Sequence, residues 1–206
     1  MNLSSCVKAA ATAAVFLAVA GASTIASAVS FAGGYTINAL HSDPGLVIET
    51  QELADPLSFS LGTPGDKYTV DLFKIWTDET FINSDDKAQA GISVDFDFSS
   101  PASTGSVTGT TMGGSVLIFS GGKVAWDGPS VLAFGNGGAL KISLSDETFN
   151  VGVFGNTLPG WKHGATVEAT FELVSDVQPV PLPASLPLFA AALGGLGLLR
   201  RRSRKA

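Results

Sequence analysis

The central part of the chain alternates between hydrophobic and polar residues with the two-residue period of β-strands. In the segment 92–99, Ile92, Val94, Phe96 and Phe98 are apolar, and every intervening residue is Ser or Asp. The segment 166–173 repeats this pattern, with Val, Ala, Phe and Leu on one side and Thr or Glu on the other. Such alternation predicts strands with one buried and one exposed face.

Further strands are predicted from shorter apolar or alternating segments. These are residues 35–40, 46–53, 57–61, 68–75, 115–120, 123–127, 131–134, 140–144 and 149–153. Turn residues such as Asp43-Pro44-Gly45 and Asn136-Gly137-Gly138 separate them. Gly121-Gly122 directly before Lys123 predicts a hairpin turn, and the segment 100–114, rich in Ser, Thr and Gly, is expected to be a long loop.

Within 68–75 the apolar phase changes between Leu72 and Phe73, which predicts a bulge. No segment between the two chain ends shows a helical period. We therefore expect an all-β fold, an antiparallel β-sandwich with a jelly roll as one candidate connectivity. An N-terminal signal helix and a C-terminal transmembrane helix are expected to flank it.

Residues 1–28 have the features of a secretory signal peptide. Lys8 supplies positive charge, residues 9–22 are apolar, and Ala26-Ser27-Ala28 fits the small-residue cleavage rule. We expect cleavage after Ala28, so the exported domain is residues 29–177. Cys6, the only cysteine, lies in the removed segment, and the mature protein then has no disulfide and no thiol ligand.

The other end of the chain predicts a membrane anchor. Residues 178–185 form a Pro-rich linker, and residues 186–199 contain no charged side chain. As a helix this apolar segment would span roughly 21 Å at about 1.5 Å per residue, short of the roughly 30 Å of a hydrocarbon core. The basic segment 200–206 is expected to stay cytoplasmic as a stop-transfer signal; its cations are Arg200, Arg201, Arg202, Arg204 and Lys205.

The linker carries the motif Val180, Pro181, Leu182, Pro183 and Ala184, followed by the Gly-containing apolar segment and the Arg-rich end. In this order they resemble the VPLPA-CTERM variant of the PEP-CTERM sorting domain of Gram-negative bacteria. The resemblance covers residues 180–206. It implies that an exosortase, a multi-spanning membrane enzyme, recognises the motif and cleaves near it. The domain would then pass from the inner membrane to the cell surface or the exopolysaccharide matrix.

The exported segment is strongly acidic. All 18 Asp and Glu residues of the chain lie within 29–177, together with only six lysines and no arginine, which gives this segment a formal charge of −12. Nucleic acids and anionic lipids are bound through basic surfaces, so neither is an expected partner. The charge favours solubility and could attract divalent cations.

Candidate catalytic residues are few. His41 and His163 are the only histidines, and no G-x-S-x-G nucleophile motif accompanies them. The Gly clusters also lack the phosphate-loop pattern. We therefore expect a protein that is not an enzyme. A secreted hydrolase stays open as an alternative, and it requires one of these histidines in a pocket beside an Asp or Ser.

Two kinds of binding residue are candidates. Trp76, Trp126 and Trp161 could stack on sugar rings, although a lone Trp in a sandwich usually packs in the core. Asp95 and Asp97 project from one strand face about 7 Å apart, with Asp85-Asp86 in a nearby loop, and carboxylates of this kind could bind Ca²⁺. Strand Asp residues are also common on a solvated face, and no other cofactor is expected.

The leading hypothesis is an exported structural or adhesive protein of the cell surface or extracellular matrix, processed by an exosortase. A carbohydrate-binding module is the first alternative, with an exposed Trp or Tyr in a shallow groove beside Asp, Asn or Lys. In both cases exopolysaccharide is a candidate partner.

Overall fold

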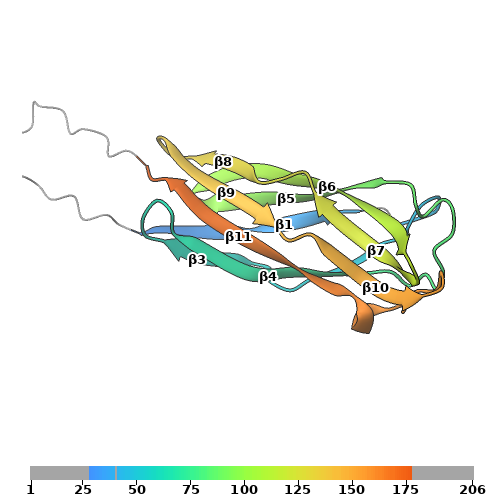
Figure 1. The fold of residues 1–206 in the computed structure, drawn as a ribbon. Coiled ribbons are helices and arrows are strands. Elements are labelled where there is room, and N and C mark those ends of the chain that lie inside the picture. The colour runs from blue at the N-terminus through green and yellow to red at the C-terminus, as the bar shows by residue number, and fades with distance from the viewer. Residues whose placement is uncertain (1–27, 40, 178–206) are drawn as a thin grey trace, which may run out of the picture.

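The computed structural model describes residues 28–39 and 41–177. The predicted signal peptide up to Ser27, the Val180–Ala184 motif, the apolar segment 186–199 and the basic tail 200–206 lie outside the described residues. The described part of the chain is all-β, with two curled antiparallel sheets packed face to face (Figure 1). The sandwich-like all-β class expected from the sequence is therefore confirmed.

The two sheets differ in size and strand order. The larger contains, in spatial order, β10 (Glu147–Val153), β7 (Phe119–Trp126), β6 (Ala102–Val116), β5 (Ala90–Ser100), β1 (Val29–Asn38) and β3 (Leu57–Leu61). The smaller contains β2 (Glu49–Glu52), β4 (Lys67–Trp76), β11 (Ala165–Ser175), β9 (Gly138–Leu144) and β8 (Ser130–Phe134). A short 3-10 helix, η1 (Trp161–His163), precedes β11.

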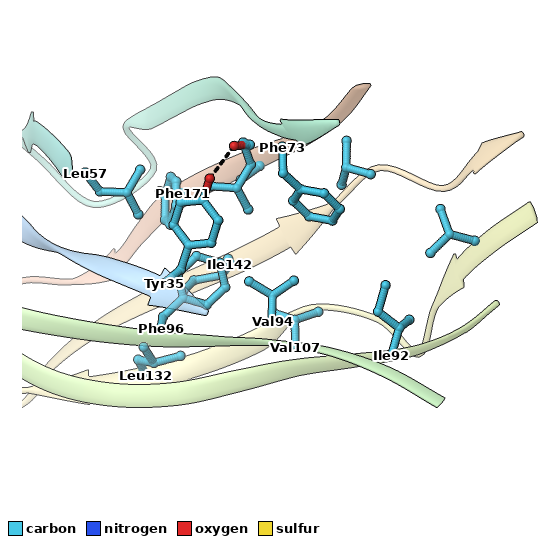
Figure 2. Packing of buried hydrophobic residues seen from close by; sticks show 14 of the residues in the cluster. Tyr35, Leu57, Phe73, Ile92, Val94, Phe96, Val107, Leu132, Ile142 and Phe171 are labelled. Atoms are coloured by element: carbon cyan, nitrogen blue, oxygen red, sulfur yellow. Dashed lines mark hydrogen bonds between the residues drawn. The ribbon is translucent and has the colours of Figure 1, made fainter. Parts of the chain in front are cut away.

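Aromatic side chains from facing strands form the centre of the core (Figure 2). Phe171 of β11 lies against Phe96 and Phe98 of β5, with ring centroids 5.8 Å and 6.2 Å away and the rings nearly perpendicular. All three side chains are almost completely buried. Edge-to-face pairs add stabilisation beyond the burial of apolar area, so the inward faces predicted for these two strands are the ones that hold the sheets together.

Tyr35 places a polar group inside this core. Its hydroxyl donates a hydrogen bond to the Leu72 carbonyl of the opposite sheet, and burial raises the pKa of this phenol to about 12. Leu72 and the next residue, Phe73, are both buried, and the pairing of β4 with β11 shifts register at this point. The bulge predicted from the phase change at these residues is confirmed.

Strand β6 corrects the expectation of a long loop at 100–114. It is the longest strand of the described residues and pairs with β5 on one side and β7 on the other. Small residues occupy several of its inward positions because neighbouring strands fill the space above them. A Cβ added to Gly105 would lie 2.8 Å from the Leu132 side chain, and one added to Gly109 would lie 2.6 Å from a backbone oxygen of β7. The glycines permit close packing here and do not mark a turn.

The turn between β6 and β7 also differs from the sequence expectation. The chain reverses at residues 116–119, where Leu117 has a positive φ of 58°, and the predicted strand 115–120 is split by this turn. Gly121 and Gly122 lie inside β7. A Cβ on Gly122 would be only 2.2 Å from the Phe149 ring of β10, so the glycine pair makes room for an aromatic side chain.

Strand β10 has an irregularity that reverses its predicted faces. The sequence pattern places Phe149, Val151 and Val153 on one inward face, but only Phe149 is buried. Asn150 has a positive φ of 52°, and the register with β7 shifts between Phe149 and Gly152. Because a one-residue shift moves side chains to the other face, the two valines are exposed.

The two chain ends of the domain lie at the same end of the sandwich (Figure 1). Val29 pairs with Leu61, and the following β3–β4 turn contacts the end of β11 through the Gly65 N–H, which donates to the Leu173 carbonyl at 2.7 Å. At the opposite end lie the β1–β2 loop (39 and 41–48 of the described residues), the β4–β5 loop (77–89), the β6–β7 turn (116–119) and the loop 154–160. We call this the distal end. No helix within the described residues has the length and apolarity needed to cross a membrane.

Candidate functional site

Trp161 is the most exposed of the three tryptophans considered as sugar-stacking residues. It lies on η1, its side chain is 48% exposed, and the ammonium of Lys74 is 3.8 Å from its ring centroid. Trp76 follows Lys74 by two residues on β4, so both project from the outer face of the smaller sheet. The structure therefore brings two of the predicted tryptophans and a cation to one surface.

Trp126 instead lies at the edge of the core. Its indole N–H donates to the Ser145 carbonyl at 3.0 Å, and its ring meets Phe73 edge-on. An open groove of about 490 Å³ lies over the end of β1, the start of β5 and the middle of β6, between Asn38 and Gly109, and no aromatic side chain of the described residues lines it. The combination of groove and aromatic platform expected for a carbohydrate-binding module is not found at this groove.

The two histidines belong to different elements, His41 to the segment between β1 and β2 and His163 to η1. His41 is exposed, and its Nδ1 lies 2.6 Å from the Ile48 carbonyl. His163 is exposed on η1. Within the described residues neither imidazole forms a hydrogen bond with an Asp or Ser side chain, which is the arrangement that the hydrolase alternative requires.

Asp95 and Asp97 lie on the exposed face of β5, as the alternation predicts. Both carboxylate oxygens of Asp95 already accept hydrogen bonds, one from the Asn38 amide at 2.9 Å and one from the Ser106 hydroxyl at 2.5 Å. No third carboxylate or imidazole of the described chain joins them in a cluster of metal-ligand geometry. Asp95 therefore has partners on its own sheet surface.

A different group of carboxylates comes together at the distal end. Asp43 belongs to the β1–β2 loop, and Glu79 and Asp86 belong to the β4–β5 loop. One carboxylate oxygen from each lies within 4.8 Å of the other two. Asp43 is exposed, Glu79 is partly buried and Asp86 is completely buried. We call this group the acidic cluster.

Asp86 is held rigidly at the bottom of the cluster. Its Oδ2 accepts the Asn83 N–H at 2.7 Å, and its backbone carbonyl accepts the Gly113 N–H of β6 at 2.7 Å. The other carboxylate oxygen, Oδ1, is buried and has no hydrogen-bond partner. Thr111, which shares the inward face of β6 with Gly113, has the same property: its buried Oγ1 also has no partner. Orphaned polar atoms of this kind are rare in native interiors.

Glu79 is fixed from two directions. The Val47 N–H donates to its Oε1 at 2.7 Å, which joins the two loops, and the Thr157 hydroxyl donates to its backbone carbonyl. Burial raises the pKa of the Glu79 carboxyl above its ordinary value; the bond from Val47 opposes this, and the charges of Asp86 and Asp43 add to it. The carboxylate is thus held where a negative charge is costly without a partner.

Asn150 supports this loop from β10. Its side chain is buried, its Oδ1 accepts the Thr77 N–H at 2.9 Å, and its Nδ2 donates to the Gly160 carbonyl at 3.1 Å. The positive φ at Asn150 turns the side chain inward between the β4–β5 loop and the loop 154–160. The loops that carry the cluster are therefore connected to the sheets by buried hydrogen bonds.

Sequence reasoning identified only part of the acidic cluster. It noted Asp85-Asp86 as oxygen-rich, but Asp43 and Glu79 gave no separate signal, because they belong to loops whose proximity depends on the fold. Asp85 itself points its Oδ2 toward the Gly45 N–H at 3.4 Å, which adds a second link between the same two loops.

Exposed apolar side chains gather at the distal end, where the β6–β7 turn meets the end of β10. Leu117 is 95% exposed, and the others that share this position are Val116, Ile118, Phe119, Val153 and Phe154. The Phe154 N–H donates to the Ile118 carbonyl at 2.7 Å, which fixes the two segments to one another. We call this surface the apolar tip. Val116 and Phe119 of the tip also line, together with Val151 and Lys123, a hollow of about 200 Å³.

Comparisons with protein-family models, with curated proteins and with solved structures give no match for this chain.

Proposed function

We propose that this protein is an exported component of the cell surface or extracellular matrix with a structural or adhesive role. An exosortase would sort it through the Val180–Ala184 motif. The sequence of residues 180–206 and its resemblance to VPLPA-CTERM tails support the sorting part of the proposal. In this proposal the precursor is flanked by a signal helix and a transmembrane helix at 186–199, passes through the inner membrane, and is not an enzyme. The jelly-roll connectivity stays a prediction.

The observation that carries the adhesive role is the position of the apolar tip. Large apolar side chains clustered on a surface are typical of interaction sites, and these lie at the distal end, away from Val29 and Ser175. A domain attached through its C-terminal tail would therefore present the tip outward. The acidic surface of the rest of the domain keeps the protein soluble while the tip makes contact.

The adhesive role is tested by removing the apolar surface without touching the core. The double variant Leu117→Ser/Phe119→Ser changes only exposed side chains, and Val131→Ser, at 59% exposure on the edge strand β8, is the matched control. In cultures of each strain we expect the tip variant to move from the matrix pellet to the medium, while the control stays with the pellet. Equal retention of both variants would contradict the adhesive role of the tip.

The sorting part has its own test. Replacing Pro181 and Pro183 with Ala in the motif leaves the domain unchanged, so export should continue while processing stops. We expect precursor mass to accumulate in the membrane fraction. Normal release of a shortened protein from this variant would argue against recognition of the motif.

Carbohydrate binding is kept as a second candidate because of Trp161. Its half-exposed ring, with Lys74 on it and Trp76 on the same outer surface, is a plausible stacking site for a sugar. Trp161→Ala should then abolish binding of the protein to isolated exopolysaccharide, whereas Leu117→Ser should leave it unchanged. The reverse result would favour the apolar tip as the contact surface.

A further inference from the structure

We propose that Asp43, Glu79 and Asp86 bind a divalent cation of the Ca²⁺ class, which fastens the β1–β2 loop to the β4–β5 loop at the distal end. The site differs from the Asp95 and Asp97 pair that the sequence pattern suggests. It is formed by two loops that only the fold brings together.

The acidic cluster concentrates like charges in a small volume. Three carboxylate oxygens within 4.8 Å of one another repel strongly when ionised, more so where one group is completely buried. Both ion pairs of the described residues involve Glu172, at the other side of the domain, so no Lys, Arg or His of this part of the chain neutralises the cluster. A bound cation would supply the missing positive charge.

The Oδ1 atom of Asp86 lacks a hydrogen-bond partner, and this holds whatever the charge of the cluster. This oxygen is buried and accepts no hydrogen bond, although Oδ2 of the same carboxylate is bonded to the Asn83 N–H. The side chain beside this carboxylate in the cluster is another carboxyl group, that of Glu79. Buried polar atoms without a partner are rare in native interiors, and a metal ion accepts a carboxylate oxygen of this kind as a ligand.

The ligand chemistry selects the type of cation. Every side chain of the group offers oxygen, and no His or Cys belongs to it, which disfavours Zn²⁺ and copper and favours hard cations. Ca²⁺ accepts irregular sets of carboxylate, carbonyl and water oxygens, whereas Mg²⁺ demands a near-ideal octahedron. Exposed Asp43 leaves one side of the cluster accessible to solvent. For an extracellular module we expect a Kd on the order of 10⁻⁴–10⁻³ M.

The competing arrangement is a proton shared between Glu79 and Asp86. A carboxyl–carboxylate pair would relieve the repulsion without metal, since one member would be neutral. The two arrangements differ in their response to Ca²⁺, because the shared proton needs none.

The test is calorimetric titration of CaCl₂ and, separately, MgCl₂ into the intact exported protein after removal of metal with EDTA. Asp43→Asn is the principal variant, because this side chain is exposed and its replacement should not disturb folding. Asp95→Asn is the control, with the same change of charge on the face of β5. Asp86→Asn is the stronger perturbation and is interpreted only where its circular dichroism spectrum matches that of the wild type.

We expect one Ca²⁺ per chain, weaker binding of Mg²⁺, at least tenfold lower Ca²⁺ affinity for Asp43→Asn, and unchanged affinity for Asp95→Asn. At about ten times the Kd, Ca²⁺ should also raise the Tm of the wild type by about 3–6 °C. The weakest expected Kd is about 1 mM, so about 10 mM Ca²⁺ should nearly saturate the site. If Ca²⁺ at this concentration produces neither heat of binding nor a shift in Tm, the proposal is overturned in favour of the shared proton. Equal loss of affinity in the Asp43 and Asp95 variants would overturn it as well, since the effect would then be one of net charge alone.

Discussion

Replacing Asn150 with Ala tests whether buried hydrogen bonds hold the loops of the distal end. The side chain is completely buried. Its Oδ1 accepts the Thr77 N–H at 2.9 Å, and its Nδ2 donates to the carbonyls of Leu158, at 2.5 Å, and Gly160, at 3.1 Å. Truncation removes these bonds at once. It leaves the N–H of Thr77, itself completely buried, without the oxygen that it now contacts.

The expected cost follows from these contacts. A buried donor without a partner costs about 1–3 kcal/mol, and each lost bond to a partly solvated carbonyl costs about 0.5–1.5 kcal/mol. Ala at a φ of 52° adds roughly 1 kcal/mol relative to Asn, which tolerates the left-handed region better. We expect the free energy of unfolding to fall by about 3–7 kcal/mol, a large share of the roughly 5–15 kcal/mol typical of a folded domain.

The assay is urea unfolding followed by tryptophan fluorescence, with the m-value compared between proteins. Asn156→Ala is the matched control, because Asn156 lies in the same region but is exposed and bonds only the Val153 carbonyl at 3.3 Å; its effect should stay within about 0.5 kcal/mol. Asn150→Gly separates the backbone contribution, and it should be less destabilising than Asn150→Ala. Equal midpoints for Asn150→Ala and Asn156→Ala would refute the assigned role of the buried amide.

Two further predictions concern the sheets and the β3–β4 turn. Gly122→Ala places a methyl group 2.2 Å from the Phe149 ring and should cost at least about 1–3 kcal/mol in urea unfolding, whereas Gly114→Ala, with no atom within 4 Å of its Cβ, should be nearly neutral; similar costs would contradict the packing argument. The pKa of Asp66 is lowered from 3.8 chiefly by hydrogen bonds from two backbone N–H groups of its turn. The ionised Asp66 carboxylate therefore stabilises the folded state at pH values above 3.8, and this stabilisation is lost as the pH falls through the lower pKa of the folded state. The Tm difference between wild type and Asp66→Asn should close under acid conditions, and a difference that stays constant would show that the carboxylate is not responsible.

The sequence predicts the fold class because alternation reports burial directly. In β5 and β11 one face is packed against the opposite sheet, so Phe96 and Phe171 occur at the positions that their period indicates. The same rule fails at β10, because the positive φ of Asn150 and the register shift beside it exchange the faces of the residues that follow. Periodicity alone contains no information on such a shift.

Strand β6 shows a second limit of the sequence. Its glycines suggest a loop when considered alone, but Leu132 and the backbone of β7 occupy the space above Gly105 and Gly109. The reason for a small residue lies in the neighbouring strands, which are distant in sequence. Gly105, Gly109 and Gly113 recur at every fourth position, with Val107 and Thr111 between them, and this spacing is the one local sign that these residues share a strand face.

The acidic cluster could not be predicted from the sequence for a related reason. Asp43 and Glu79 are brought together because β1 and β4 both end at the distal end, and the Val47 N–H then joins their loops. Loop proximity of this kind depends on the strand order of both sheets. The sorting motif is the opposite case, since its residues are contiguous and its interpretation rests on the sequence alone.

The central claim, that an exosortase sorts this protein to the cell exterior, is tested most directly by intact mass and cell fractionation. The native protein is isolated from the host strain and from a strain that lacks the exosortase. We predict a chain that begins near Val29 and ends near the Val180–Ala184 motif, found outside the cell only when the enzyme is present. A chain with an uncut C-terminus in the membrane of both strains would contradict the claim and indicate an ordinary tail-anchored protein.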